Sequence, residues 1–242
     1  MNYLVSCFFT TYKDPQRNSY WIPDTSIIAD WYKSSTHVID SGANFKMAVL
    51  YDKLPEAFIQ NFDNKYITFI KVVSQIDRSP YEYRWRAYTF FLEQITKLED
   101  SIFFTDISDV IVVSDPFRNI DHSSIYLGDE QSNKFNNSWS LERLTYYQKE
   151  PSDFMQIYDT FQSETFLNAG IIGGGFKQVK LFIDYMNYYL DILPRVPDNV
   201  TDMLLFNYVA RKHFLNLVHG TPINSVFGQY ETSRTDVYFI HK

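Results

Sequence analysis

Residues 103–113 constrain the fold more than any other stretch of this 242-residue chain. Their sequence, FFTDISDVIVV, places Asp106 and Asp109 between two short apolar runs, and each run is typical of a buried strand. Strands that are apolar throughout belong in the interior of a sheet whose two faces are covered. The two aspartates then lie in the turn at a strand's carboxyl end, where open α/β sheets bind their ligands.

Carboxylate oxygens grouped in such a turn suit a hard divalent cation that also holds substrate phosphates. The pair therefore indicates a metal-dependent enzyme that acts on a nucleotide. An ordinary solvated turn is the alternative, because aspartate is common in turns, as the neighbouring residues 114–117 (SDPF) illustrate. The spacing alone leaves both interpretations open.

Strand-like apolar runs alternate with segments of helical spacing along the chain, which predicts a single α/β domain with a mostly parallel central sheet flanked by helices. Residues 131–163 lack a clear period, so we expect loops there with one or two short helices. The predicted strands are residues 3–10, 45–51, 66–73, 101–105, 110–113, 125–127, 166–173, 215–218 and 237–240. The predicted helices are residues 25–34, 54–62, 81–98, 177–193 and 202–214.

Composition excludes several classes of protein. A net charge of −7 argues against nucleic acid as the main partner, because binding to phosphate backbones requires a basic face. The single cysteine, Cys7, excludes a disulfide framework and a cysteine-based zinc site. The sequence has no pattern of a secretory signal and no apolar run of membrane-spanning length, so we expect a cytoplasmic protein without a membrane span.

Four segments, taken in order, resemble landmarks of glycosyltransferases of the GT-A fold: residues 4–11, 105–110, 167–174 and 201–207. The resemblance covers essentially the whole chain. It implies one glycosyltransferase domain, with a Rossmann-like nucleotide-sugar-binding half over about residues 1–117 and an acceptor-side half over about residues 118–242. The turn departs from the usual D-x-D pattern because it reads D-x-x-D, a spacing shared by the glycosyltransferase domains that act on collagen hydroxylysine.

This resemblance implies a hexosyltransferase that uses Mn²⁺ or Mg²⁺ and a nucleotide-diphosphate sugar, with UDP as the expected nucleotide. The acceptor would be a glycan, a lipid-linked molecule or a protein. Asp106 and Asp109 are the expected metal ligands, and the resemblance places His241 as the third. His219 competes for that role because it also follows a predicted strand, and Lys242 would add positive charge against the phosphates.

The donor is expected to contact the end of the first strand and the start of a helix. Thr10, Thr11 and Tyr12 lie where the base and ribose would bind, since hydroxyl groups can bond to a base edge and a tyrosine ring can stack on it. The resemblance also suggests a donor-binding arginine early in the helix at residues 81–98. Arg84 and Arg86 cannot both point at one spot, and we prefer Arg84.

On the acceptor side, the resemblance places Asn168 beside the transferred sugar and makes Asp202 either a helix-opening residue, a ligand of sugar hydroxyls or a base. Gly173–Gly175 is either a binding turn or a plain strand-to-helix turn. Asp129 and Glu130 are weaker candidates for acceptor contacts.

Two other functions compete with glycosyl transfer. A nucleotidylyltransferase would also combine such a sheet with metal carboxylates, but the loop at residues 10–15 (TTYKDP) lacks the glycines of a phosphate-binding loop. A non-catalytic carbohydrate-binding protein on the same fold would bind no metal.

Overall fold

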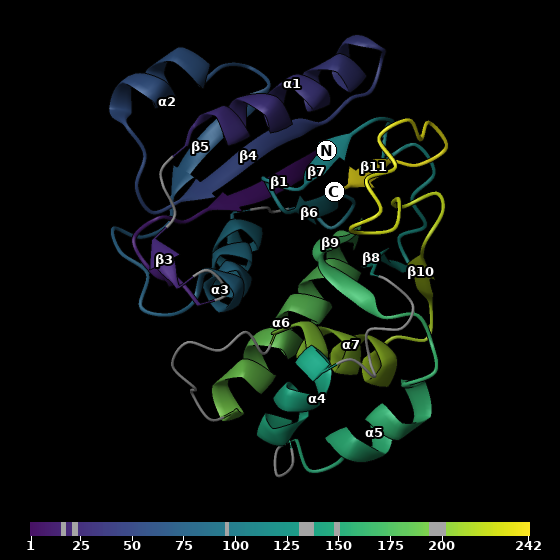
Figure 1. Ribbon diagram of the computed structural model, residues 1–242. Coiled ribbons are helices and arrows are strands. Elements are labelled where there is room, and N and C mark those ends of the chain that lie inside the picture. The colour runs from purple at the N-terminus through teal and green to yellow at the C-terminus, as the bar shows by residue number, and fades with distance from the viewer. Residues whose placement is uncertain (16–17, 21–23, 95–96, 131–137, 148–150, 194–201) are drawn as a thin grey trace.

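The computed structural model describes residues 1–15, 18–20, 24–94, 97–130, 138–147, 151–193 and 202–242, with only the backbone of Trp139. Within these residues a central sheet has the strand order β10-β8-β9-β6-β1-β4-β5 (Figure 1). All its strands run in one direction except β9, which is antiparallel to both β6 and β8. The expected α/β fold with a mostly parallel sheet is therefore confirmed.

The sheet strands are β1 (Asn2–Phe8), β4 (Lys46–Tyr51), β5 (Ile67–Lys71), β6 (Ser101–Thr105), β8 (Ile125–Asp129), β9 (Leu167–Gly175) and β10 (Leu217–His219). Two small pairs lie outside it: β2 (Lys13–Asp14) with β3 (Ser19–Tyr20), which was not expected, and β7 (Val110–Val112) with β11 (Phe239–His241). The helices are α1 (Ser26–Asp40), α2 (Glu56–Phe62), α3 (Pro80–Glu93), α4 (Ser138–Leu144), α5 (Phe154–Phe161), α6 (Phe176–Ile192) and α7 (Asp202–His213), and a 3₁₀ turn covers Thr145–Tyr147.

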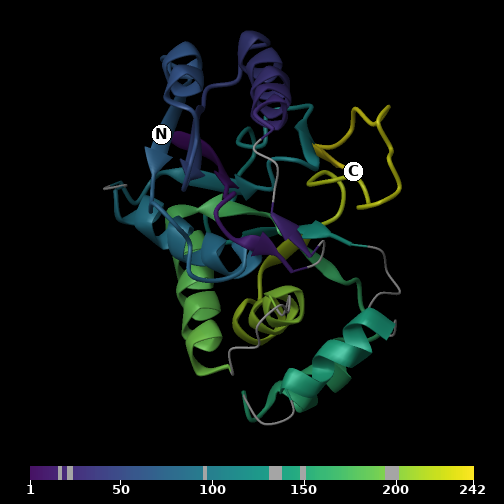
Figure 2. The ribbon, with the colours of Figure 1, turned by 60° about the vertical axis from the view of Figure 1, so that its left-hand side comes forward.

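Helices cover both faces of the sheet, as Figure 1 shows, with α1 and α2 on one face and α3, α6 and α7 on the other. In α1, Ile28, Trp31 and Val38 are buried at helical spacing and pack on the first face. The second face holds the larger core, to which α6 contributes Phe182 and Met186. Figure 2 shows α4 and α5 beyond α7, on the side of the molecule away from α1 and α2. Among the described residues, no helix combines the length and apolarity that crossing a bilayer requires.

The second apolar run of the D-x-x-D segment was expected in the sheet interior, and this expectation is wrong. β7 leaves the central sheet and pairs only with β11, antiparallel, so that His241 lies opposite Val110. This two-stranded ribbon packs on the face covered by α1, where Val110, Val112 and Phe239 join the core. Because of this pairing, a segment from the far end of the chain lies beside the aspartate turn.

The glycine run Gly173–Gly175 lies at the passage from β9 to α6, with Gly175 as the N-cap of α6, which agrees with the strand-to-helix alternative. It forms the buried end of β9, and α6 begins immediately after it. A Cβ atom on Gly173 would lie 2.1 Å from the Phe103 ring of β6, so a side chain at this position would clash with the neighbouring strand. The glycines therefore allow close packing of two strands and lie at the edge of the sheet opposite to the polar one described below.

Other differences concern boundaries. α1 continues to Asp40, beyond the expected residue 34, whereas α3 ends at Glu93 instead of reaching residue 98. β10 begins at Leu217, two residues later than expected, because Leu215 is fully exposed in the preceding turn.

Candidate functional site

Polar residues gather at one edge of the sheet. The carboxyl ends of β1, β4, β6, β8 and β10 meet there, because these strands are parallel, and antiparallel β9 begins there. Thr10, Asp52, Asp106, Asn168 and His219 each lie at or just beyond one of these strand ends. The topology thus brings the predicted donor-side and acceptor-side residues to a single edge, as expected for ligand binding in open α/β sheets.

Gly170 marks the centre of this edge. A Cβ atom built on it would lie 2.7 Å from Asp106 Oδ2, 2.8 Å from His241 Cε1 and 2.9 Å from Asn168 Oδ1. The Asp106 backbone N–H donates to the Gly170 carbonyl (2.8 Å), and the Gly170 N–H donates to Asn168 Oδ1 (2.6 Å). A residue without a side chain is therefore required here, because three predicted site residues border the same small space.

His241 is fully buried at the end of β11. Neither of its ring nitrogens has a hydrogen-bond partner among the described residues. Burial lowers the pKa of His241 to about 4, an effect that Asp106 opposes and Arg84 reinforces. The imidazole is neutral at pH 7, with a lone pair available on one nitrogen, which is the form that binds metal ions.

The backbone of His241 is fixed by the segment that runs beside β11. The His241 N–H donates to Ser225 Oγ (2.9 Å), and the Ser225 N–H donates to the Phe239 carbonyl (3.0 Å). The Phe227 ring packs edge-on against the imidazole, with ring centroids 4.6 Å apart. These contacts hold a buried, unpaired imidazole in one orientation.

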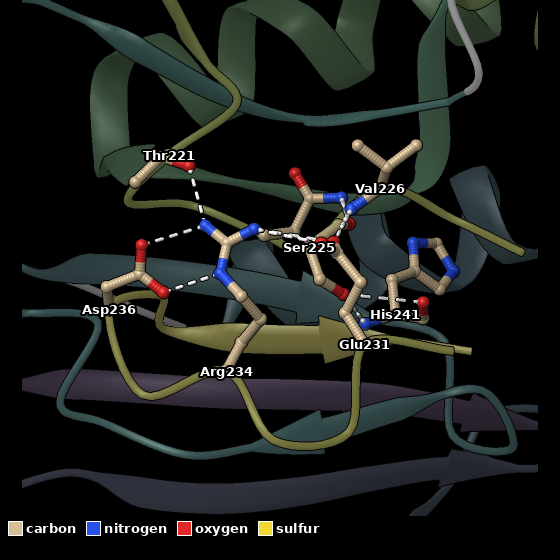
Figure 3. A network of polar contacts seen from close by, with 8 residues as sticks. Thr221, Ser225, Val226, Glu231, Arg234, Asp236 and His241 are labelled. Atoms are coloured by element: carbon tan, nitrogen blue, oxygen red, sulfur yellow. Dashed lines mark hydrogen bonds and ion pairs between the residues drawn. The ribbon is translucent and has the colours of Figure 1, made fainter. Parts of the chain in front are cut away.

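Figure 3 shows how the loop after Ser225 is held in place. The Arg234 guanidinium binds Asp236 (2.5 and 2.9 Å), Glu231 (3.3 Å) and the Thr221 hydroxyl (3.0 Å). Glu231 in turn accepts a hydrogen bond from the Val226 N–H (3.2 Å). The network closes the loop upon itself and keeps its first residues next to β11.

Arg84 links the D-x-x-D turn to α7. Its guanidinium, buried at the start of α3, pairs with Asp106 (2.9 Å) and with Asp202 (2.5 Å). Burial alone would lower the pKa of Arg84, but the two carboxylates outweigh it and raise the pKa above its ordinary value. Burial also raises the pKa of Asp202, and Arg84 opposes that shift. One cation thus pairs with two carboxylates from distant parts of the sequence.

The two arginines of α3 lie in different surroundings. Arg86 is partly exposed and forms an ion pair with Asp191 of α6, whereas Arg84 points into the core beneath the turn. Asp202 is fully buried, so its contact with Arg84 favours a positioning role over direct contact with sugar. The sequence gives no sign of the Arg84–Asp202 pair, because 118 residues separate its members.

The amide of Asn168 is engaged at both ends. Its oxygen accepts from Gly170, and its NH₂ group donates to Glu130 Oε2, a carboxylate that is also buried. Glu130 was only a weak candidate from sequence, and the structure brings it next to Asn168. This pairing fixes which end of the amide faces Asp106 and His241.

Buried Asp52 shapes the turn after β1. It accepts hydrogen bonds from the backbone N–H groups of Thr10 (3.0 Å) and Thr11 (2.8 Å) and from the Thr11 hydroxyl (2.5 Å). The Thr11 hydroxyl also accepts from the Ile76 N–H (3.1 Å), and the Tyr12 ring packs against the core. The Thr11 side chain is therefore engaged within the protein. Sequence reasoning missed Asp52, whose position directly after a strand was the available signal.

The backbones of Asp109 and Lys242 lie side by side, and the Asp109 side chain lines the same cavity as Asp106. The Lys242 N–H donates to the Asp109 carbonyl (2.8 Å), as the pairing of β7 with β11 requires. The Lys242 side chain lines a groove of about 910 Å³ between α1 and β7. A separate cavity of about 100 Å³ lies between α3, the end of β1 and the turn, and is lined by Arg84, Tyr88 and Asp106.

The predicted metal ligands fit a divalent ion in their chemistry. Two carboxylates and a neutral imidazole form a mixed oxygen–nitrogen donor set that suits Mn²⁺, and the unpaired nitrogens of His241 are consistent with a missing partner. In the described part of the chain, however, no three His, Cys, Asp or Glu side chains converge closely enough to hold an ion as they stand. His219, the competing third ligand, instead pairs with Asp129 three strands away from β6.

The lowered pKa of His241 makes a prediction about stability. The unfolded chain binds a proton at about pH 6.5 and the folded protein only near pH 4, so stability falls as the pH drops between these values. We expect this histidine to account for roughly 3 kcal/mol of that loss in metal-free protein. Urea unfolding of the wild type and His241→Gln across this range measures the effect. Equal pH profiles would show that the imidazole is not buried in its neutral form.

Comparisons with known proteins assign the fold to a class. No family model matches the sequence, and no curated protein matches it. Solved structures do match, and the two described below are glycosyltransferases, so the chain shares the fold of these enzymes. Their identity to this chain is low, and the likeness therefore concerns the fold.

Two of these structures illustrate the match. The galactosyltransferase LgtC, solved in complex with donor and acceptor sugar analogues, is 16% identical with a TM-score of 0.52, over 100% of this chain and 86% of LgtC. The bifunctional glycosyltransferase WbbM is 12% identical with a TM-score of 0.57, over 98% of this chain and 45% of WbbM. The present chain thus spans less than half of WbbM and most of LgtC.

Proposed function

We propose that this protein is a metal-dependent glycosyltransferase that moves a hexose from a nucleotide-diphosphate donor, UDP-linked, to a hydroxyl group of a glycan, lipid-linked or protein acceptor. The observation that carries the proposal is the grouping of Asp106, His241 and Asn168 around Gly170. This grouping lies at the ligand-binding edge of a fold shared with LgtC, which was solved with donor and acceptor sugar analogues.

In this proposal, Asp106, Asp109 and His241 hold a Mn²⁺ or Mg²⁺ ion. Such an ion, when bound, neutralises the charge of the diphosphate leaving group as a Lewis acid. Arg84 supplies a second, permanent positive charge at the same turn and is oriented by Asp202. Because Arg84 also pairs with Asp106, binding of the ion requires this carboxylate to share its charge between the two cations.

Other residues serve the donor and the transferred sugar. The turn at Thr10, Thr11 and Tyr12, shaped by Asp52, is the proposed contact for base and ribose. Asn168, fixed by Glu130, faces the space where the sugar would lie and presents its amide oxygen to a hydroxyl group. Lys242 extends the positive charge toward the groove along α1.

The fold comparisons do not favour the nucleotidylyltransferase alternative, because the matching structures described above are glycosyltransferases. The turn after β1 is also organised by Asp52 instead of by glycines, which leaves its first N–H groups occupied by a carboxylate. A non-catalytic carbohydrate-binding protein would retain the fold but would have no need for a metal-dependent donor site.

A thermal-shift screen tests the proposal. UDP-sugars and GDP-sugars are compared, each with and without Mn²⁺, on the wild type and on Asp109→Asn. We expect UDP-sugars to raise the melting temperature only when Mn²⁺ is present, and the variant to lose most of the shift, because ligands that bind only the folded state stabilise it. If no nucleotide-sugar changes the melting temperature, a non-catalytic role replaces the proposal.

A further inference from the structure

A second titratable pair lies at the same polar edge, away from the metal residues. His219, at the end of β10, bonds through Nδ1 to Asp129 Oδ1 at the end of β8 (2.8 Å). A carboxylate can only accept, so Nδ1 carries a proton, and Nε2 is the ring nitrogen left for a ligand. The side chains are 30% and 15% exposed, and the described residues show no hydrogen bond to Nε2. The pair therefore offers one ring nitrogen, in a fixed orientation, for a hydrogen bond with a ligand.

Asn224 holds this pair rigidly. Its side chain forms two hydrogen bonds with the Asp129 backbone. Asn224 Oδ1 accepts from the Asp129 N–H (3.0 Å), and Asn224 Nδ2 donates to the Asp129 carbonyl (3.1 Å). Asn224 is only 2% exposed and bridges to Phe239 of β11. Two partly buried bonds behind a partly exposed dyad resemble the supporting contacts that orient binding residues. An ordinary surface ion pair has no need for such support.

The position of the dyad determines what it can contact. β9 and β8 lie between β6 and β10, so the backbone of His219 is roughly 14 Å from that of Asp106 at the usual strand spacing. This distance is too long for contact with a hydroxyl group that reacts beside Asp106. The buried Asn168–Glu130 pair lies between them along the edge.

We propose that His219, oriented by Asp129, binds a hydroxyl group on a second sugar unit of the acceptor. The acceptor is then a glycan of at least two units, which reaches along the edge from Asp106 toward β10. His219 is a specificity-determining residue and does not take part in bond making. The proposal rests on the proposed glycosyltransferase function and specifies its acceptor class.

This proposal is tested by measuring how strongly the protein is retained on immobilised glycans. The glycans have one, two or more sugar units, and UDP and Mn²⁺ are present. We expect the wild type to bind glycans of two or more units and His219→Gln to bind them about tenfold more weakly, the equivalent of one lost hydrogen bond. His122→Gln is the matched control, because His122 is exposed at the opposite edge of the sheet, where it contacts Ser101. It should bind as the wild type does.

A parallel thermal-shift measurement with UDP and Mn²⁺ distinguishes failure of the proposed glycosyltransferase function from failure of the proposed role of His219. If the wild type shows no shift, the glycosyltransferase function itself is wrong. If His219→Gln shows the wild-type shift but keeps wild-type glycan binding, only the role of His219 is overturned. Equal retention on single sugars and longer glycans, or no retention on any glycan, also contradicts an acceptor of two or more units.

Discussion

Asp106→Asn is expected to lower kcat/KM for sugar transfer by about 1,000-fold, equivalent to roughly 4 kcal/mol of transition-state stabilisation. Asp106 is the proposed metal ligand nearest to Gly170, and it also pairs with Arg84. An amide in its place keeps the shape of the side chain but removes the charge that would hold the ion. Steady-state kinetics with a UDP-sugar and Mn²⁺ measure the loss, and the metal-dependent thermal shift should disappear with it.

The matched control for this change is Asp115→Asn. Asp115 belongs to the same segment and accepts a hydrogen bond from the Phe117 N–H (2.9 Å), a turn contact that an asparagine oxygen can retain. This variant should keep wild-type activity. Asp106→Asn should also remain folded, because Asp202 still neutralises Arg84. Wild-type activity in both Asp106→Asn and Asp109→Asn would overturn the proposed function.

Arg84→Met is expected to reduce the free energy of unfolding by about 3–5 kcal/mol, the usual effect of removing one partner from a buried ion pair. The substitution leaves Asp202, which is fully buried, without its cation. Arg86→Met, two residues further along α3, removes only a surface pair with Asp191 and should cost less than about 1 kcal/mol. Urea unfolding of the three proteins makes the comparison, and equal stabilities would contradict a stabilising role for the buried Arg84–Asp202 pair.

The loss in Arg84→Met should depend on pH in a defined direction. Arg84 lowers the pKa of Asp202 against the larger effect of burial, so its removal raises that pKa further. A carboxyl group with a raised folded-state pKa stabilises the fold below its unfolded pKa and loses this contribution as the pH rises. The difference between wild type and variant should therefore be smaller at pH 5 than at pH 8. Replacing Asp202 as well, in Arg84→Met/Asp202→Asn, should remove this dependence.

The sheet could be predicted from the sequence because its strands are locally distinct, but the pairing of β7 could not. Residues 110–113 have the same apolar pattern as the strand before the turn. Their partner is Phe239–His241, more than a hundred residues later, and no local pattern distinguishes such pairing from membership of the central sheet. The close packing at the glycine run could not be predicted for a related reason, since the space that Gly173 leaves is filled by Phe103 from another strand.

In the candidate site, too, features with a local sequence pattern could be predicted and long-range contacts could not. Residues that follow strands, such as Asp106 and Asn168, could be proposed from position, because strand ends of an open α/β sheet form the ligand-binding edge. The partners that orient them could not, since Asp202 and Glu130 are joined to Arg84 and Asn168 only by the tertiary fold. Burial of Arg84 in place of Arg86 had a usable local signal, because Arg84 lies one helical turn before the core residue Tyr88.

Two adjacent residues, Asn224 and Ser225, hold two separate parts of the polar edge. Asn224 fixes the backbone of Asp129, and Ser225 fixes the backbone of His241. The residues that anchor Asp129 and His241 are thus separated by a single peptide unit, so their spacing is set by covalent geometry instead of by packing. An insertion between Asn224 and Ser225 would therefore move the anchor of Asp129 away from the anchor of His241.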